Sequence, residues 1–267
     1  MATNSTFRLL TFNCLWQGAA RARLNAIAPV LNESDLDFLC LQEVTQKRNV
    51  SLLQRHLPSY GPAAFVPYGV AVKGGLVNFA RRPIESGSYE VFRGKAPRWT
   101  LGLADRLLRK GFLISRLRLD AVGVVVVNTH MLANYDEDWT TGNRFVTEQR
   151  KDLAQLAEAV RRLDRESLVI VAGDFNVPMT NPLFVEFTSR CDLRSAFGPA
   201  PDAAPATIRQ ARPDRPALTI DNVLFRAPAG SSFQATARLR FEEPVMLTSG
   251  RQTVASDHLA VEAEFVF

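Results

Sequence analysis

Short runs of apolar residues recur along the chain and are bounded by polar or turn-forming residues. This pattern is typical of buried or half-buried β-strands. The last run alternates, with Glu262 and Glu264 facing away from Val261 and Ala263, as a sheet with one solvated face requires. The predicted strands are Phe7–Asn13, Asp37–Gln42, Leu76–Ala80, Phe112–Leu119, Val124–Thr129, Leu168–Ala172, Thr219–Phe225 and Leu259–Phe267.

Two other segments carry apolar residues at helical spacing. The segment Leu24–Leu31 has an apolar stripe, although Pro29 predicts a kink or an early end of that helix. The segment Leu153–Val160 has a cleaner stripe, with arginine and glutamate on the opposite face. Strands interleaved with a few covering helices favour layered sheets with helices outside, which is an α/β sandwich.

The chain is 267 residues long, which fits one large domain better than two. Residues 198–216 are rich in proline and alanine, but strand-like sequence resumes directly after them. This stretch is therefore predicted to be a long surface loop and not a domain linker. We expect residues 1–267 to form a single domain.

Composition narrows the class of protein further. The 32 Lys and Arg exceed the 27 Asp and Glu, and the net charge of +5 favours anionic partners. The three cysteines have no CxxC spacing, so neither a disulfide framework nor a zinc site is indicated. No apolar run reaches the roughly 18 residues of a membrane span, and the N-terminus lacks a signal-peptide pattern. We therefore expect a cytoplasmic protein.

Several predicted strands end in chemically active side chains where turn residues would be expected. The polar residues at or next to strand ends are Asn13, Glu43, His130, Asp174, Asn176, Asp257 and His258. A single such Asp or Asn is usually a turn former. If the sheets are layered in register, however, these strand ends can converge at one rim, where a rigid scaffold holds catalytic groups.

The chemistry of this set is specific. Its carboxylates and amides form an all-oxygen collection, which suits Mg²⁺ or Mn²⁺ and not zinc. The chain has only three histidines, and His130 and His258 both fall among the strand ends. Because histidine titrates near neutral pH, this placement favours acid and base roles for both.

Asp221 lies inside the apolar run Thr219–Phe225, where an unpaired carboxylate is costly. A histidine is the natural partner, because an Asp bonded to one imidazole nitrogen leaves the other free to take a proton from water. The alternatives are an Asp that caps a turn and an Asp that pairs with an arginine.

Six short motifs then appear in one order along nearly the whole chain. They are Thr11-Phe12-Asn13, Leu41-Gln42-Glu43-Val44, Asn128-Thr129-His130, Gly173-Asp174-Phe175-Asn176, Ile220-Asp221 and Ser256-Asp257-His258. In these motifs the chain resembles the endonuclease/exonuclease/phosphatase superfamily, which includes DNase I. The resemblance implies a four-layered α/β sandwich, with two packed, mostly antiparallel sheets flanked by helices. It also implies metal-assisted hydrolysis of a phosphate ester by in-line attack of water.

The resemblance assigns a metal site to three of these residues. Glu43 matches the principal metal ligand, and Asn13 and Asp257 match residues close to the metal or its waters. The implied cofactor is Mg²⁺, with Mn²⁺ as the alternative. A dication bridging the phosphate would offset the charge that builds on the oxygens in the transition state.

The same resemblance assigns catalytic roles. Asp174 and Asn176 would position the nucleophile and a phosphate oxygen, and His258 would act as base oriented by Asp221. His130 would steady the phosphate or protonate the leaving group. The base is left shared between Asp174 and His258. The chain departs from the family pattern after Asp221, where an aromatic residue is common.

The local likeness is strongest to neutral sphingomyelinases and related phosphodiesterases. It rests on Gly74–Ile84, on Lys110-Gly111-Phe112, and on Tyr135, Arg144, Gln149 and Arg150. A phospholipid phosphodiesterase is therefore the leading hypothesis, and a nuclease or an inositol or sugar phosphatase is the alternative. The histidine that follows the Asn-Thr-His motif in some sphingomyelinases is not evident here. A binding scaffold without activity is disfavoured, because the acid, base and metal positions are intact.

The segment Phe92–Arg118 interleaves basic residues with Trp99, Leu103 and Leu107 at helical spacing. Such a helix could contact a membrane surface or a nucleic acid, or it could simply pack on the sheet. Trp99, Arg144 and Arg150 are the candidate substrate-binding residues. The expected partner is a phosphate ester, that is, a phospholipid headgroup, a nucleic acid or a small ester. We expect a monomer with peripheral membrane contact as an option.

Overall fold

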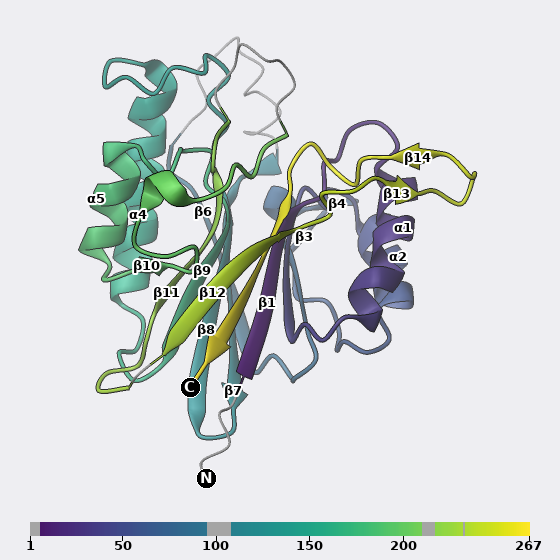
Figure 1. The fold of residues 1–267 in the computed structure, drawn as a ribbon, viewed down its shortest axis with the longest axis horizontal. Helices are drawn as coiled ribbons and strands as arrows, with labels where there is room; N and C mark the ends of the chain where they lie inside the picture. Colours follow the sequence, from purple (N-terminus) through teal and green to yellow (C-terminus); the bar gives the residue numbers. More distant parts are fainter. Residues whose placement is uncertain (1–5, 95–107, 210–216, 232) are drawn as a thin grey trace.

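The computed structural model describes residues 6–94, 108–209, 217–231 and 233–267. Two sheets pack face to face between two pairs of helices (Figure 1). The first sheet has five strands, in the order β12 (Gln234–Arg240), β15 (Ala260–Val266), β1 (Thr6–Asn13), β2 (Phe38–Gln42) and β5 (Val77–Ala80).

The second sheet has six strands. Their order is β10 (Arg194–Ser195), β11 (Asp221–Arg226), β9 (Leu168–Asp174), β8 (Val122–His130), β7 (Gly111–Leu119) and β6 (Ser86–Val91). Only β1 with β2 and β8 with β9 pair in parallel, and the other neighbours in both sheets are antiparallel. The expected mostly antiparallel sandwich is confirmed.

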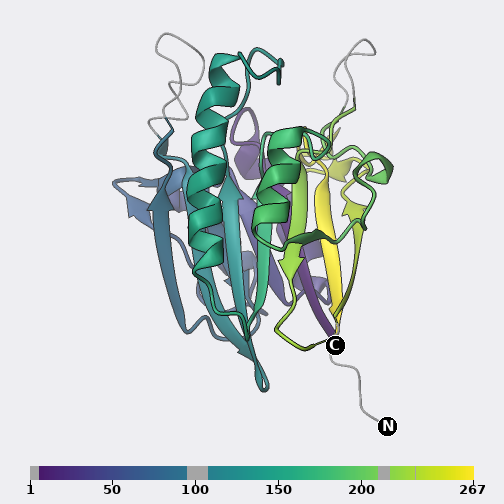
Figure 2. The same cartoon turned by 90° about the vertical axis from the view of Figure 1, so that its left-hand side faces the viewer.

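Helices α1 (Ala20–Glu33) and α2 (Lys47–His56) cover the first sheet, and α4 (Arg144–Arg161) and α5 (Pro182–Arg190) cover the second (Figure 2). The short elements are β3 (Pro67–Tyr68), β4 (Ala71–Val72), η1 (Lys73–Gly75), η2 (Pro201–Ala203), β13 (Val245–Met246) and β14 (Gln252–Thr253). None of the helices in the described part of the chain is long and apolar enough to cross a membrane.

Three apolar clusters fill the three interfaces between these four layers. Phe7, Val126 and Phe265 belong to the cluster between the sheets. Leu24 of α1 packs with the outer face of the first sheet, and Leu156 of α4 packs with the outer face of the second. Because apolar residues alternate in and out along the central strands, both faces of each sheet are buried in its middle.

Two predictions from the residue pattern are wrong. Pro29 does not end its helix, because α1 continues to Glu33 with Pro29 on the exposed side. The packing of the apolar stripe against the sheet outweighs the lost hydrogen bond. Glu262 is not solvated, because Arg238 and Arg240 of β12 pair with its two carboxylate oxygens and cover it.

Within the proline-rich stretch, the described residues 198–209 are not all part of a surface loop. Thr207 is fully buried, and Ile208 forms an isolated bridge with His258. The predicted helix around Trp99 lies outside the described residues, while Phe112–Arg116 forms part of strand β7.

Candidate active site

The ends of the central strands bring the predicted residues together at one edge of the sandwich. The parallel pairs place Asn13 beside Gln42 and His130 beside Asp174. Strand β11 runs antiparallel to β9, so its first residue, Asp221, also lies beside Asp174. Strand register thus gathers residues that are far apart in the chain.

Two glycines allow this edge to be closely packed. A Cβ on Gly173 would lie 2.0 Å from the carbonyl oxygen of Thr129, and the residue has a φ of 146°. A Cβ on Gly75 would lie 3.2 Å from the Cα of Glu43. Glycine is needed at both positions because the backbone of a neighbouring strand end occupies the space.

A buried chain of amides joins the two sheets beneath the site. Gln42 donates to Asn128 at 2.8 Å, Asn128 donates to Asn78 at 2.8 Å, and Asn78 donates to Ser115 at 3.0 Å. Asn128 therefore has a structural role within its Asn-Thr-His motif. Since Gln42 precedes Glu43 and Asn128 lies two residues before His130, the chain fixes the two halves of the site relative to each other.

Asp174 is the centre of the site. Its Oδ2 accepts a hydrogen bond of 3.0 Å from Asn13 of the other sheet, and its Oδ1 accepts one of 2.9 Å from the backbone of Asn176. The Nε2 atoms of His130 and His258 lie 3.4 Å and 3.9 Å from Oδ2. One buried carboxylate therefore contacts an amide and two imidazoles.

His258 is held by Asp221. Its Nδ1 lies 2.8 Å from Oδ2 of Asp221, and both side chains are buried. The hydroxyl of Thr207 accepts hydrogen bonds from the backbone N–H groups of Ile220 and Asp221, which anchors the start of β11. The expected pairing of Asp221 with a histidine is thus present, and its orienting role remains a prediction.

The negative charges of this group are partly compensated within the protein. Burial lowers the pKa of His258, but the carboxylates of Asp221 and Asp174 outweigh burial and raise it to about 10. Burial and the neighbouring Asp221 raise the pKa of Asp174. The ligand atoms of all three lie within 4.8 Å of one another, a spacing that could also hold a metal ion. A protonated imidazole between two carboxylates accounts for this spacing without one.

Glu43 forms an open rim next to this buried group. It follows β2 with a φ of 61°, which turns the chain out of the sheet. One carboxylate oxygen accepts the backbone N–H of Trp16 at 2.8 Å, and the other lies 3.4 Å from the amide of Asn13. Asn13 therefore bridges the rim to Asp174.

Asp257 lies on the same side and is exposed. Its backbone carbonyl accepts from the N–H of Arg209, whose guanidinium bonds the carbonyl oxygens of Ser256 and Phe241. Burial lowers the pKa of Arg23, while Cys14, Asp257 and Glu43 act in the opposite direction. Both carboxylates are therefore close enough to Arg23 to stabilise its positive charge.

The residues of this rim fit a hard divalent ion. Glu43 and Asp257 supply carboxylate oxygens and Asn13 supplies an amide, which is the donor chemistry of Mg²⁺. In contrast to the buried group, the rim keeps its carboxylates open to solvent.

A family model described as the endonuclease/exonuclease/phosphatase family matches residues 10–258. The chain belongs to this family. The family hydrolyses phosphate esters, and the protein is accordingly a hydrolase of phosphate ester bonds. A search of curated protein sequences found no match.

Solved structures with the same fold cover nearly the whole chain. SmcL aligns with 98% of this chain and 99% of its own, at a TM-score of 0.74 and 15% identity. Sphingomyelinase C from Streptomyces griseocarneus aligns with 97% and 99%, at a TM-score of 0.72 and 18% identity. A beta toxin mutant from Staphylococcus aureus, with bound magnesium ions, aligns with 97% and 99%, at 0.71 and 14%. At these identities the likeness establishes the DNase I-like fold.

The sequence patterns did not identify Lys110 as a functional residue. The buried ammonium of Lys110 lies 2.8 Å from Nε2 of His130 and donates to the carbonyl oxygen of Met131 at 2.9 Å. A lysine before a strand is ordinarily solvated, so only the pairing of Gly111 with His130 reveals its position. The motif Lys110-Gly111-Phe112 was the available signal.

Lys110 determines the tautomer and the charge of His130. An ammonium group can only donate, so Nε2 of His130 accepts and Nδ1 carries the proton. Burial, followed by the positive charges of Lys110 and His258, lowers the pKa of His130 well below its ordinary value. His130 is therefore neutral at physiological pH.

Asn176 lies at the floor of the site. Its amide donates to the carbonyl oxygen of Met131 at 3.1 Å, and its own carbonyl oxygen accepts from Gln149 of α4 at 2.8 Å. Its φ of 52° turns the chain directly after β9. Asn222 stands where the family resemblance leads one to expect an aromatic residue. Its side-chain oxygen accepts a hydrogen bond of 2.9 Å from the Ser195 hydroxyl.

Two of the three candidate substrate-binding residues, Arg144 and Arg150, do not join this group. Arg144 forms two hydrogen bonds with Asp136, and Arg150 lies 3.9 Å from Glu186 of α5, on the outer helical layer. Trp99 lies outside the described residues. A role of these three residues in substrate binding stays a prediction.

Proposed function

We propose that the protein is a Mg²⁺-dependent phosphodiesterase that hydrolyses its substrate by in-line attack of water. The observation that carries this proposal is the contact of Asp174 with groups from both sheets. Asn13 connects it to the rim at Glu43, and His258 connects it to Asp221. The rim that would bind the metal and the group that would transfer the proton thus lie side by side.

The rim would hold the ion. Glu43 would be the main ligand, with Asn13 and Asp257 bound directly or through water. When bound, the ion would polarise the phosphate and offset its negative charge. Arg23 bonds the carbonyl oxygens of Leu15 and Gln17, which keeps the loop after β1 in place beside this rim.

The buried group would accept the proton of the attacking water. Asp174 and His258 would act together as the base toward the attacking water: while the imidazole is protonated, the Asp174 carboxylate beside it would take the proton, and Asp221 would hold the imidazole in one orientation. A carboxylate whose pKa is raised by burial is a better proton acceptor than an ordinary one. The base is the group of two side chains, because they titrate together.

Neighbouring groups would position the phosphate. Asn176 would bond a phosphate oxygen through its amide. His130, which is neutral beside Lys110, would steady the phosphate and would not act as an imidazolium acid. The Lys110 ammonium would add positive charge next to the developing negative charge.

The proposal is tested by replacing Glu43 with glutamine. Glu43→Gln keeps the side-chain volume but removes the charge, so we expect kcat to fall by about 10²–10³-fold. Calorimetry should show a matching loss of Mg²⁺ affinity. The exposed Glu243 offers the control, since Glu243→Gln should leave both quantities unchanged. Hydrolysis by EDTA-treated protein at the Mg²⁺-loaded rate would contradict the metal assignment.

A substrate panel tests the ester class. Purified protein with Mg²⁺ would be assayed on a chromogenic phosphodiester, sphingomyelin, plasmid DNA, RNA and inositol phosphates. Turnover of diesters with little release from monoesters is expected. Preference for an inositol or sugar monophosphate would instead support the phosphatase alternative.

A further inference from the structure

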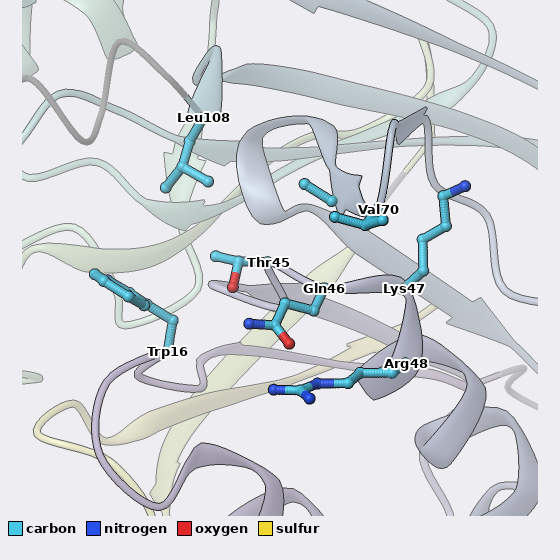
Figure 3. Close-up of a pocket in the computed structure, with 8 residues that line it drawn as sticks. Trp16, Thr45, Gln46, Lys47, Arg48, Val70 and Leu108 are labelled. Atoms are coloured by element: carbon cyan, nitrogen blue, oxygen red, sulfur yellow. The ribbon is translucent and has the colours of Figure 1, made fainter.

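An open groove lies directly beside the rim. It has a volume of about 830 Å³, which is within the range of small-molecule sites. Its walls are mainly apolar, and its lining residues are Trp16, Thr45, Gln46, Lys47, Arg48, Val70, Ala71 and Leu108. In Figure 3, Trp16 and Leu108 lie on one side of Thr45 and Gln46, and Val70 lies on the other.

The apolar side chains of this groove are unusually exposed. Val70 is 87% exposed and Trp16 is 45% exposed. The neighbouring Tyr68 is also exposed, and it packs under the guanidinium of Arg109. Contiguous exposed apolar residues next to an active site mark a surface that is covered when a ligand binds.

Both walls of the groove are held by hydrogen bonds to their backbone carbonyl oxygens before any ligand arrives. The Trp16 loop is fixed by Arg23, which donates to the carbonyl oxygens of Leu15 and Gln17. The opposite wall is a turn at Val70, whose carbonyl oxygen accepts from the N–H of Lys47 at 3.1 Å. A preformed groove binds a ligand with a smaller loss of entropy than a mobile loop.

The groove is continuous with the reacting centre. The N–H of Trp16 donates to a carboxylate oxygen of Glu43 at 2.8 Å, and Thr45 bonds the Glu43 carbonyl through its N–H at 2.9 Å. A diester carries two substituents on one phosphorus. When the phosphate lies at Glu43, one substituent can therefore enter the groove.

The charge of the groove limits what this substituent can be. Lys47 and Arg48 open helix α2, where the helix dipole adds further positive potential. In Figure 3, the Arg48 side chain extends from its helix toward the side of the groove where Trp16 lies. When a dication at the rim neutralises Glu43, a cationic group beside Trp16 would be repelled by these charges, although indole faces otherwise attract quaternary ammonium groups.

We propose that this groove binds an uncharged alkyl or acyl substituent of the phosphodiester substrate. The inference rests on the proposed function, because it needs the phosphate at the rim. It names a substrate class, namely anionic phosphodiesters with an apolar tail next to the phosphate.

A homologous series of n-alkyl phosphates tests the apolar part of this proposal. Calorimetry in Mg²⁺ would give Kd for methyl, butyl, hexyl and octyl phosphate, below the concentration at which micelles form. Burial of each methylene should lower Kd by about two- to fourfold until the groove is full. An equal Kd across the series would overturn the proposal.

A pair of isosteres tests the charge. Choline phosphate and 3,3-dimethylbutyl phosphate have nearly the same shape, but only choline carries a positive charge. The neutral ester should bind more tightly by about tenfold, because the positive charges of Lys47 and Arg48 repel choline. Tighter binding of choline phosphate would show that Trp16 receives a cationic headgroup, and the proposal would be wrong.

Val70→Asp places a charge in the groove and should remove at least half of the gain per methylene. Val185→Asp is the matched control, because Val185 is exposed on α5, and it should keep the full gain. If adenosine or thymidine monophosphate binds more tightly than octyl phosphate, and loses affinity in Val70→Asp, the occupant is a base and the alkyl assignment is overturned.

The controls distinguish this inference from the proposed function. If the wild type cleaves a chromogenic phosphodiester with Mg²⁺ but shows a flat alkyl series, only the groove assignment fails. If it neither cleaves the diester nor binds methyl phosphate, the proposed function fails and the groove assignment fails with it.

Discussion

The two halves of the candidate site differ in how the negative charge of their carboxylates is compensated. Asp174, Asp221 and His258 are buried, and a protonated imidazole between the two carboxylates offsets one of their two negative charges within the protein. At the rim, Glu43 is half-buried and Asp257 is exposed, and both contribute negative charge near Arg23.

This difference indicates separate roles for the buried group and the rim. A group whose charges are already paired holds fixed geometry and does not need an ion, whereas open carboxylates can exchange water for an ion. We therefore expect changes in the buried group to alter kcat or stability at constant Mg²⁺ affinity. Changes at the rim should alter Mg²⁺ affinity.

The largest expected effect comes from Asp221→Asn. Loss of the charge that orients His258 should lower kcat by about 10³–10⁴-fold, with Mg²⁺ affinity nearly unchanged. Asp257→Asn should instead raise the Mg²⁺ concentration for half-maximal rate by about tenfold. Steady-state kinetics over a Mg²⁺ titration measures both. An equal Mg²⁺ shift in the two variants would remove the distinction between the halves.

A double-mutant cycle sharpens the same comparison within the buried group. Adding His258→Ala to Asp221→Asn should cost little beyond the single change, since the two residues act as one unit. The measurement is kcat for the wild type, both single variants and the double variant. Losses that multiply would make Asp174 alone the better candidate for the base.

The pH dependence of stability should also separate the halves. The raised pKa of His258, about 10, exceeds its unfolded value of about 6.5. Its contribution is therefore complete below pH 6.5 and is lost as the pH rises through about 10. In EDTA, the free energy of unfolding should fall between pH 7 and 10 by on the order of a few kcal/mol more in the wild type than in His258→Gln. The free energies would be measured by urea denaturation at each pH. An equal decrease in the wild type and in His258→Gln would contradict the ion-pair assignment.

A smaller effect is expected at Lys110, which acts through His130. Lys110→Met removes the donor to Nε2 and one positive charge, so the pKa of His130 should rise and kcat should fall by about tenfold. The acidic limb of the pH–kcat profile should move to higher pH. Lys110→Arg should restore part of the rate, and Lys151→Met on the exposed face of α4 is the control. An unmoved pH profile would leave Lys110 a purely structural role.

The smallest effect is expected at Arg150, outside both halves. Its guanidinium lies near Glu186 and away from the strand ends, so Arg150→Ala should change KM by less than about twofold. A tenfold rise in KM without a change in kcat would instead support the role in substrate binding that its position in the sequence suggested.

Local pattern was sufficient for most of the sandwich. The central strands were predicted to within a few residues, because burial on both faces leaves near-continuous apolar runs, as in Leu168–Asp174. The strand-end motifs were predictable for the same reason, since a polar residue after such a run stands out. Isolated chemical groups such as Glu43 and His258 could be identified without knowledge of their neighbours.

Local pattern failed where a distant element decided the outcome. Pro29 is accommodated because α1 packs on a sheet, and Glu262 is covered because β12 brings two arginines beside it. Lys110 gave no signal of burial, because its partner His130 is reached only through the pairing of β7 with β8.

The sequence by itself determined which chemical groups this protein has and at which strand ends they lie. Only the tertiary structure decided which of them touch. Asn13 and Asp174 are 161 positions apart and come from different sheets, yet they are joined at 3.0 Å. Such contacts depend on strand register and on the packing of one sheet on the other. Both are determined by many residues together, so no single position in the sequence predicts them. The groove between Trp16 and Val70 arises in the same way, from two turns that meet only in the folded chain.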